Sequence, residues 1–269
     1  MAPPDYPVKI GRMLYSLNDP EEGYEVAYHR WYERDHFYAG QMVGAGMFAG
    51  SRWVATRELK DLRIPNDDTN AVTIPWDAGS YLATYWLLQG REDEYLKWAG
   101  ENMPWLYAND RGFTNRTHRH TVFYDYRDTI YRDDDPVPIE LALDHHYNGL
   151  VSIAIDRANG VSEADLDEWL RRDGIPTLLA GSAIAMGSLW TPVQRDQLTS
   201  NAPMHLGSPT GGENRMFHVF FTETDVRESW DRVVDYVSRV NESGLGTVVF
   251  AGPFHRMIVG TDTYIDQIW

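Results

Sequence analysis

The chain has 269 residues, 43% of them hydrophobic, with 10 Trp, 16 Tyr, 9 Phe, no Cys and a formal net charge of −16. The lack of cysteine excludes disulfides, thiolate metal sites and a cysteine nucleophile, so any chemistry must come from His, carboxylate, Tyr or Ser side chains. The negative charge disfavours nucleic acid and anionic membranes as partners, because both are bound by clustered Lys and Arg.

Hydropathy indicates a protein that is not embedded in a membrane. No apolar run approaches the roughly 18 residues that span a bilayer, and the opening segment MAPPDYPVKIGRM lacks the apolar centre of a signal peptide. We therefore expect a cytoplasmic monomer or homodimer whose partner is a hydrophobic small molecule. The many aromatic side chains suit a core and a pocket lined with rings.

The first half of the chain predicts the element order βαββαβ. Asp19, followed by Pro20 and two glutamates, is typical of a helix N-terminus, and the strands are rich in β-branched and aromatic residues. The expected elements are a strand at 8–17, a helix at 20–35, strands at 46–59 and 81–89, a helix at 92–102 and a strand at 117–126.

The second half repeats this order. Ser162 and Asp165 form a capping-box pattern before its first helix, and Val226, Trp230, Val233 and Val237 give its second helix an apolar stripe. The expected elements are a strand at 149–158, a helix at 163–172, strands at 183–191 and 216–223, a helix at 225–240 and a strand that begins at His255.

Short sequence matches support an internal duplication. WYERDHFYAG (31–40) aligns with WLRRDGIPTL (169–178), GSRW (50–53) with GSLW (187–190), and the His-Arg pair at 118–119 with that at 255–256. We expect one repeat at 1–135 and a second at 136–269, joined by the acidic segment DDDPVPIE.

Two βαββαβ units predict an α+β fold in which two ferredoxin-like repeats pack as an intramolecular dimeric α/β barrel. Each unit covers one sheet face with its own helices, so the two uncovered faces should pack together, with the pocket between them. Polar insertions at 58–80 and 193–215 precede the third strand of each repeat. We expect loops that cover the barrel mouths or the neighbouring surface, and that at least one shields the pocket.

These motifs resemble the dimeric α/β-barrel proteins and, among them, the EthD-like branch. The branch has a helix that ends in an aromatic, acidic D-H-x-P type segment before a glycine-containing rise into strand two, which WYERDHFYAG resembles with Tyr38 in place of Pro. The ending GPFHRMIVGTDTYIDQIW is also similar. The resemblance implies a range of activities: cofactor-free cyclases, monooxygenases and isomerases, haem-dependent peroxidases and dehydratases, and accessory proteins.

His36 is the leading catalytic candidate. A neutral imidazole near pH 7 can accept and return a proton. The alternative is that His36 caps the last carbonyls of its helix or bonds to a tyrosine. The second repeat has Gly174 at the matching position, and a structural cap would be needed in both copies, which favours catalysis.

The last strand of the first repeat supplies further candidates. His118 and His120 are two residues apart, so a regular strand turns both to one side together with Tyr124 and Tyr126. We expect His120 and Tyr124 to be catalytic, and His118 and Tyr126 to bind substrate. The alternative is a pair of histidines at the frayed beginning of the strand.

Three aromatic residues and a possible set of metal ligands remain to be considered. Tyr32, Tyr85 and Trp86 are expected to contact substrate. A metal could be assembled from Asp144, His145, His120 and His36, but no ligand spacing singles them out, so no metal site is predicted.

The residues and the resemblance together lead to three hypotheses. The first is an enzyme that uses no cofactor and acts by histidine general acid or base chemistry on an aromatic or polyketide-like molecule, as a cyclase, lyase, isomerase or cofactor-free oxygenase. The second is a haem-binding tandem barrel protein of the dehydratase or peroxidase kind. The third is a non-catalytic binding or accessory protein.

Overall fold

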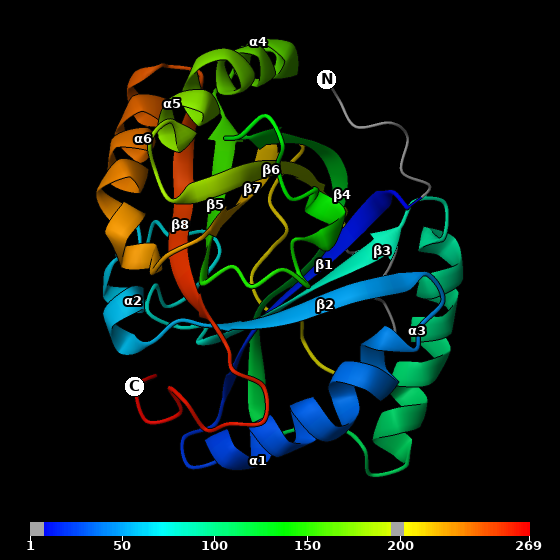
Figure 1. The fold of residues 1–269 in the computed structure, drawn as a ribbon. Helices are drawn as coiled ribbons and strands as arrows, with labels where there is room; N and C mark the ends of the chain where they lie inside the picture. The colour runs from blue at the N-terminus through cyan, green and yellow to red at the C-terminus, as the bar shows by residue number, and fades with distance from the viewer. Residues whose placement is uncertain (1–7, 195–201) are drawn as a thin grey trace.

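The computed structural model describes residues 8–194 and 202–269. They form a closed barrel in which all neighbouring strands pair antiparallel, in the order β1-β3-β2-β8-β5-β7-β6-β4 (Figure 1). The strands are β1 (Ile10–Pro20), β2 (Met47–Val54), β3 (Tyr81–Leu88), β4 (Arg116–Tyr131), β5 (Gly149–Arg157), β6 (Ile184–Pro192), β7 (Arg215–Thr222) and β8 (Gly246–Arg256).

Helices cover the outside of the barrel. In Figure 1, α1 and α3 lie on the side of the first four strands, and α4, α5 and α6 lie on the side of the last four. The helices are α1 (Glu25–Trp31), the π-helix η1 (Tyr32–Met42), α2 (Arg57–Asp61), α3 (Glu92–Ala108), η2 (Ile139–Leu141), α4 (Glu163–Trp169), the π-helix η3 (Leu170–Gly174), α5 (Ile175–Leu179), η5 (Val226–Ser229) and α6 (Trp230–Glu242).

The four strands of each half remain neighbours, which confirms the expected fold of two ferredoxin-like repeats. The first half has the order β4-β1-β3-β2 and the second the order β8-β5-β7-β6. The halves join along two seams. β4 pairs with β6 from Tyr124 to Tyr131, whereas β2 pairs with β8 only at Trp53 and Val54.

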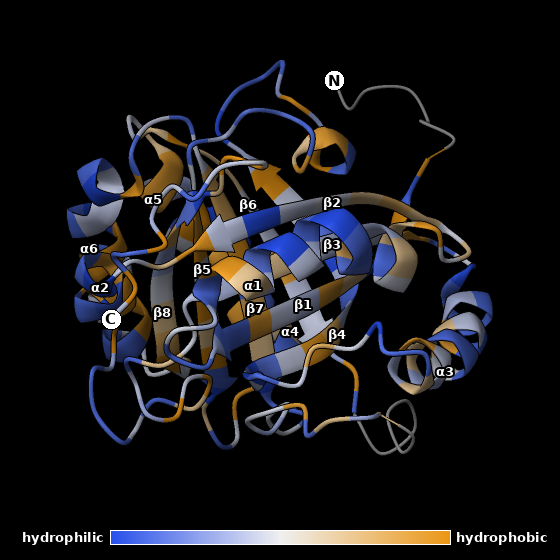
Figure 2. Ribbon diagram, turned by 90° about the horizontal axis from the view of Figure 1, so that it is seen from below, coloured by the Kyte–Doolittle hydropathy of each residue, from blue (hydrophilic) through white to orange (hydrophobic). Residues whose placement is uncertain are grey.

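The barrel interior is a packed aromatic core, and the apolar colouring of its strands in Figure 2 fits this description. Trp86 stacks on Trp190 with ring centroids 5.1 Å apart. The Trp53 indole donates to Thr84 Oγ1 at 3.0 Å, so its N–H is satisfied inside the core. The cavity described below lies outside this core, so the expectation of a pocket between the two sheets is wrong.

The N-terminal helix begins later than the sequence suggests. Asp19 and Pro20 belong to β1, and α1 starts at Glu25. The Asp19 carboxylate accepts hydrogen bonds of 2.7 Å from the backbone N–H groups of Gly79 and Ser80, so it holds a loop instead of capping a helix. The sequence expectation of a helix at 20–35 is also too short, since η1 continues to Met42.

Residues 57–59 lie in α2 and not in the strand expected at 46–59. The side chain of Thr56 accepts a hydrogen bond from the backbone N–H of Leu59 and caps this helix. The Ser162–Asp165 capping box at the start of α4 is present as expected.

Each half contains a β-bulge, and aligning the two bulges changes the alignment of the repeats that the sequence suggested. In β4 the register shifts at Arg119, between His118 and His120, and in β8 it shifts at Val249. Because β8 starts at Gly246, His255 lies at the end of its strand while His118 lies near the start of β4, so the expected pairing of these two histidines is wrong. Aligning the bulges equates His118 with Val248 and His120 with Phe250.

Each polar insertion pairs with the bulged strand of the other half. Ser208 N–H donates to the Arg119 carbonyl at 2.8 Å, and Ala71 N–H donates to the Val249 carbonyl at 3.1 Å. The two insertions meet where Ser208 Oγ donates to the Val72 carbonyl at 2.7 Å. The insertions thus cross between the repeats and cover neighbouring strands.

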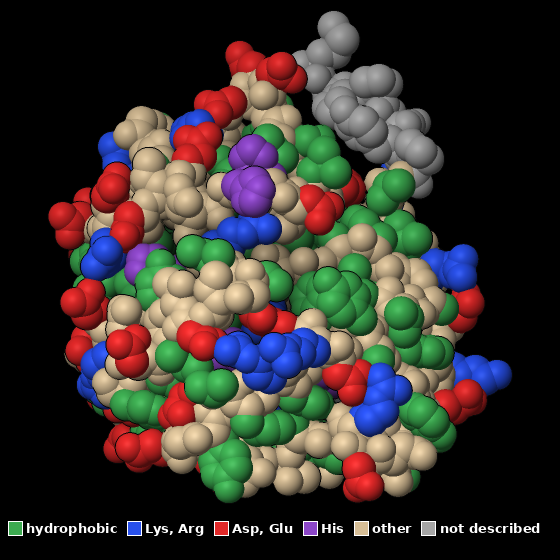
Figure 3. All heavy atoms as spheres, turned by 60° about the horizontal axis from the view of Figure 1, so that its bottom comes forward, with side chains coloured by type: hydrophobic (Ala, Val, Ile, Leu, Met, Phe, Trp, Pro, Cys, Tyr) green, Lys and Arg blue, Asp and Glu red, His purple; other side chains and the backbone are tan. Residues whose placement is uncertain are grey.

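The surface view in Figure 3 shows Asp and Glu side chains interspersed with Lys and Arg over the face that it draws. Within the described ranges, no helix combines the length and the apolar composition needed to cross a membrane.

Candidate active site

A cavity of about 330 Å³ lies in the first half, between the sheet and the helices η1 and α3. Such a volume is at the lower end of the range found for small-molecule sites, about 300 to 1,000 Å³. Leu14 and Ser16 of β1 line the sheet side, and Leu96, Ala99 and Met103 line the side of α3. The walls are therefore mostly apolar, with polar groups at particular places.

The second half completes this cavity. Ala202, Pro203, Met204 and Leu206 belong to its insertion and line the cavity wall. The sulfur of Met204 accepts a hydrogen bond of 3.1 Å from the Tyr107 hydroxyl of α3. The expectation that an insertion shields the pocket is met by this segment, which reaches across from the other repeat.

His36 lines the cavity from the middle of η1 and not from a helix end. Its ring stacks on Trp31, with centroids 4.3 Å apart and 20° between the planes, and it meets the edge of Tyr32 at 5.2 Å. Gly40 leaves room for the imidazole, because a Cβ atom there would lie 2.5 Å from His36 Nδ1. Such π-helical segments are frequent at functional sites.

The electrostatic surroundings keep His36 neutral. Burial lowers its pKa well below the usual value of 6.5, and the nearby positive charges of Arg116 and Arg52 lower it further. At pH 7 the imidazole is therefore neutral and has a lone pair that can accept a proton from a bound molecule, but it is a weaker base than an exposed histidine.

Because of the bulge at Arg119, two histidine side chains that the sequence placed on one face of β4 lie on opposite faces. His118 lines the cavity with Thr121 and Phe123, whereas His120 lies fully buried on the barrel side of β4. The expectation that His118 and His120 face one side is wrong, because the extra residue of a bulge reverses the alternation of side chains.

His118 belongs to a chain of polar groups along the sheet wall of the cavity. Its Nδ1 lies 2.7 Å from Thr121 Oγ1, which in turn lies 3.0 Å from Ser16 Oγ. Asn18 Nδ2 donates to the same Ser16 oxygen at 3.1 Å. This chain presents hydroxyl and imidazole groups that can donate to or accept from a ligand.

His120 and Tyr124 form a separate buried network inside the barrel. His120 Nδ1 lies 2.7 Å from Ser208 Oγ, and its Nε2 lies 2.6 Å from the Tyr124 hydroxyl. Ser208 donates its hydrogen to the Val72 carbonyl, so His120 must donate through Nδ1. Nε2 then accepts from Tyr124. Neither side chain lines the cavity that contains His36.

The remaining predicted site residues divide between the cavity and the barrel. Tyr32 and Tyr85 line the cavity, and their hydroxyl oxygens lie 3.0 Å apart. Burial raises the pKa of both phenols, so both keep their protons at pH 7. Trp86 and Tyr126 contact Trp190 on the barrel side of the sheet.

Sequence reasoning missed Arg116, Gln41, Tyr95 and Tyr107, which also line the cavity. The Tyr95 hydroxyl donates to Gln41 Oε1 across the space between α3 and η1. Arg116 precedes His118 by two residues, so the period-two rule for strands could have placed it on the same side. Residues 41, 95 and 107 carry no comparable signal in the sequence.

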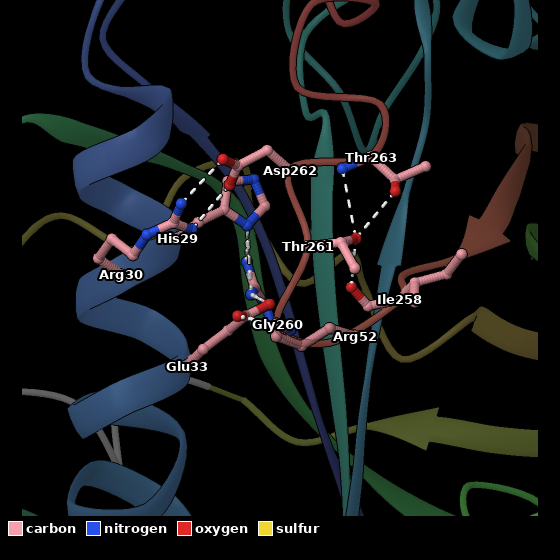
Figure 4. Close-up of polar contacts among 9 residues, drawn as sticks. All are labelled: His29, Arg30, Glu33, Arg52, Ile258, Gly260, Thr261, Asp262 and Thr263. Carbon is pink, nitrogen blue, oxygen red and sulfur yellow. Dashed lines mark hydrogen bonds and ion pairs between the residues drawn. The ribbon is translucent and has the colours of Figure 1, made fainter.

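Polar contacts of Glu33 and Arg30 join η1 and α1 to β2 and to the C-terminal segment (Figure 4). Arg52 pairs with Glu33 at 3.1 Å and lies over the Tyr32 ring at 4.4 Å. Glu33 also accepts a hydrogen bond of 3.0 Å from the Gly260 N–H, and Arg30 pairs with Asp262 at 2.7 Å. Tyr32 is the one residue of this group that lines the cavity, and Arg52 packs against its ring.

The histidines and carboxylates considered for a metal do not come together. Asp144, His145 and His146 are exposed, whereas His36 and His120 are buried on opposite sides of the first sheet. Among residues 8–194 and 202–269, no three His, Asp or Glu side chains are placed to hold a metal ion.

At the aligned positions the second half does not repeat the polar groups of the cavity. At Gly174, the match of His36, a Cβ atom would lie 2.7 Å from the Trp169 ring, so the indole leaves no room for a side chain. The aligned bulges give the remaining pairs: Ser16 matches Ile153, Asn18 matches Ile155, Arg116 matches Gly246, His118 matches Val248 and Thr121 matches Ala251.

Comparison with known proteins gives matches in structure only. No protein-family model and no curated sequence matches the chain. An anthrone oxidase-like protein matches with a TM-score of 0.50 and 9% identity, over 94% of this chain and 95% of that one. A protein assigned as a chlorite dismutase matches with a TM-score of 0.53 and 11% identity, over 95% and 98%.

A dye-decolorizing peroxidase from Bacteroides thetaiotaomicron matches with a TM-score of 0.52 and 8% identity, over 98% of both chains. The chain has the tandem dimeric α/β-barrel fold. At these identities the likeness shows the fold alone, and a fold of this kind serves many chemistries.

Proposed function

We propose that this chain is an enzyme in which His36 acts as the general base on a hydrophobic, aromatic or polyketide-like molecule bound in the first-half cavity. The observation that carries the proposal is the neutral, buried imidazole of His36 in the wall of an apolar cavity of about 330 Å³. Proton transfer by such a group contributes about 10²- to 10⁴-fold to a rate.

The geometry supports a proton abstraction. A ligand in the cavity can present a C–H or O–H bond to His36, whose ring is fixed by Trp31. The hydroxyls of Tyr32 and Tyr85 keep their protons, and one of them donates its hydrogen to the other. The accepting hydroxyl keeps its own O–H free to donate to an enolate or phenolate oxygen that forms next to it. Cyclisation, lyase or isomerase chemistry and cofactor-free oxygenation all begin with this step.

The EthD-like resemblance of residues 31–40 is consistent with proton abstraction, and we retain membership of that branch as part of the proposal. We also propose that the chain divides into repeats at 1–135 and 136–269. The proposed catalytic residue is His36, with Tyr32, Tyr85 and His118 as substrate-binding residues that share its cavity.

A haem-binding protein is the second candidate, because the fold is shared with a dye-decolorizing peroxidase. The cavity does not suit this group well. A volume of about 330 Å³ fits a molecule of two or three fused rings better than a porphyrin with its propionates, and Arg116 is the one cationic side chain among the cavity-lining residues of the described chain. A visible spectrum of the purified protein distinguishes the candidates, since bound haem gives a strong Soret band.

The general-base proposal is tested by hydrogen exchange in D₂O. The purified protein is incubated with anthrone and with aromatic 1,3-dicarbonyl compounds, and loss of the acidic C–H signal is followed by NMR. We expect catalysed exchange by the wild type, and a rate on the order of 10²-fold lower for His36→Ala.

His255→Ala serves as the matched control. His255 stacks on Tyr264 near the C-terminus, with ring centroids 5.4 Å apart, and does not line the cavity. Its replacement should lower the melting temperature more than the exchange rate. Wild-type exchange by a folded His36→Ala protein would refute the general-base role, and ligand binding without any exchange would favour an accessory protein.

A further inference from the structure

The buried arginines of this protein differ in how their charge is compensated. Arg52 pairs with Glu33 at 3.1 Å, and Arg215 pairs with Asp156 at 2.7 Å. Arg63, which is 1% exposed, also has no ion pair with Asp or Glu in the described parts of the chain, but it donates to the backbone carbonyls of Trp76, Ala78 and Gly79 outside the cavity lining. Arg116, which is 6% exposed, has no such ion pair either, and it lines the cavity. A buried guanidinium without a counterion is costly, so its position in a cavity wall calls for an explanation.

The hydrogen bonds of Arg116 all go to neutral groups. Nε donates to the Phe113 carbonyl at 3.1 Å, Nη2 donates to the Tyr107 hydroxyl at 2.9 Å, and Nη1 makes a long contact of 3.4 Å with Asn18 Oδ1. A guanidinium has five N–H bonds, so these contacts account for three of them. The guanidinium also lies 4.7 Å from the Trp31 ring, but none of the described neighbours that hold it carries a negative charge.

Other polar groups lie on the same wall. Asn18 connects Arg116 to Ser16, and Ser16 contacts Thr121, which contacts His118. The opposite wall consists of Leu96, Ala99 and Met103 of α3. The cavity therefore has a cationic, hydrogen-bonding side and an apolar side.

The repeat comparison shows that the fold does not require this charge. Gly246 holds the position of Arg116 in the second half, and Ile155 holds that of Asn18. Both halves form the same ferredoxin-like unit, so Arg116 is not needed to build the unit.

We infer that Arg116 binds an oxyanion, and that the natural ligand is an aromatic molecule with an acidic group: a carboxylate, or a phenol or enol that ionises when bound. The oxyanion lies against Arg116 and the Ser16–Thr121–His118 groups, and the rings lie against α3. That this ligand is a substrate rests on the proposed function, but its binding does not depend on the chemistry of His36.

Three matched probes test the inference by isothermal titration calorimetry: 2-naphthoate, 2-naphthol and neutral 2-naphthamide. We expect the wild type to bind the naphthoate more tightly than the amide. If the site also accepts a phenolate, the affinity for the naphthol should rise at alkaline pH. Arg116→Gln should weaken naphthoate binding by about 10- to 100-fold, the effect of losing a hydrogen bond to a charged group. Binding of the amide should change by less than about threefold.

Arg91→Gln is the control, because Arg91 is exposed, pairs with Glu94 outside the cavity lining and should leave all three affinities unchanged. Arg116→Lys keeps the charge and should retain the preference for the acid, which covers the case in which Arg116→Gln fails to fold. Equal binding of acid and amide by the wild type, equal weakening of both by Arg116→Gln, or no binding of any probe at millimolar concentration would overturn the inference.

The same titrations separate this inference from the proposed function. His36→Ala should keep the preference for naphthoate. If that preference holds while the exchange assay shows no role for His36, the oxyanion site stands and the general-base proposal fails.

Discussion

Arg116 and His36 lie against the same indole: the guanidinium carbon of Arg116 is 4.7 Å from the centroid of the Trp31 ring, and the His36 imidazole stacks on that ring at 4.3 Å. Trp31 is itself held by a hydrogen bond of 2.8 Å from its Nε1 to the Arg111 carbonyl. One fixed ring thus lies against both the proposed base and the proposed anion-binding group, and the nearby charge of Arg116 lowers the pKa of His36.

This coupling predicts proton uptake when an anionic ligand binds. Burial, Arg116 and Arg52 lower the pKa of His36, so the free protein holds it neutral. An oxyanion beside Arg116 offsets that positive charge and favours the imidazolium, so the pKa of His36 should rise on binding. Calorimetric titration of naphthoate at several pH values from 7 down to 5, each in two buffers of different ionisation enthalpy, should show net proton uptake by the wild type that grows as the pH falls. The same uptake in His36→Ala would assign it to another group.

The second-half insertion should matter for binding more than for stability. Met204 lines the cavity and contacts Tyr107, but it is not part of the packed barrel core. Met204→Ala should weaken binding of naphthoate and of its amide by about three- to tenfold through lost apolar contact, with little change in melting temperature. Ile74→Ala, in the exposed part of the first insertion, is the control and should change neither. Equal losses of affinity and stability in Met204→Ala would contradict this assignment.

The fold could be predicted from the sequence because the repeated residues are those that packing needs. Trp53 and Trp190 both lie in the barrel core, and Asp35 and Asp173 each form an ion pair with an arginine, Arg111 and Arg239. Such positions keep their residue type in both copies. The ends of elements were less predictable, since Asp19 and Pro20 have the composition of a helix start but are held in β1 by the loop that Asp19 binds.

The site was predicted only in part, for a physical reason. His36 could be found because its chemistry and its absence from the second copy are visible in the sequence. The bulge at Arg119 is fixed by pairing with the insertion of the other half, a contact that no local pattern reports. It turned His120 and Tyr124 away from the cavity and brought Thr121 into it. Whether Arg116 has a counterion likewise depends on which residues the fold brings next to it, and the local sequence does not show this.

The buried histidines predict a loss of stability in mild acid. Burial and then the charge of Arg52 lower the pKa of His29 to about 3, and burial lowers that of His218 to about 3. Below the unfolded-state value of about 6.5, the unfolded chain binds protons that the folded chain does not. The free energy of unfolding should therefore fall as pH drops from about 6.5, by up to about 1.4 kcal/mol per pH unit for each histidine.

Urea unfolding between pH 7.5 and 5 measures this dependence, in a range above the titration of ordinary carboxylates at about pH 4. His218→Leu removes one of the groups and should give a shallower decline over that range, whatever its stability at pH 7.5. A decline as steep as that of the wild type would show that His218 is not responsible.

The hydroxyl of Tyr124 should contribute to stability and not to the exchange reaction. It lies 2.6 Å from His120 Nε2 inside the barrel, on the other side of β4 from the cavity. The aligned position in β8 is Phe254, so the barrel accepts an aromatic ring without the hydroxyl at this place. Tyr124→Phe should lower the free energy of unfolding by about 1 kcal/mol, the usual net worth of a buried hydrogen bond, and leave the exchange rate within about threefold of the wild type. Urea unfolding and the D₂O assay measure the two effects on one protein sample. A folded Tyr124→Phe protein with an exchange rate reduced on the order of 10²-fold would restore the catalytic role predicted for Tyr124 and would place the reacting molecule inside the barrel.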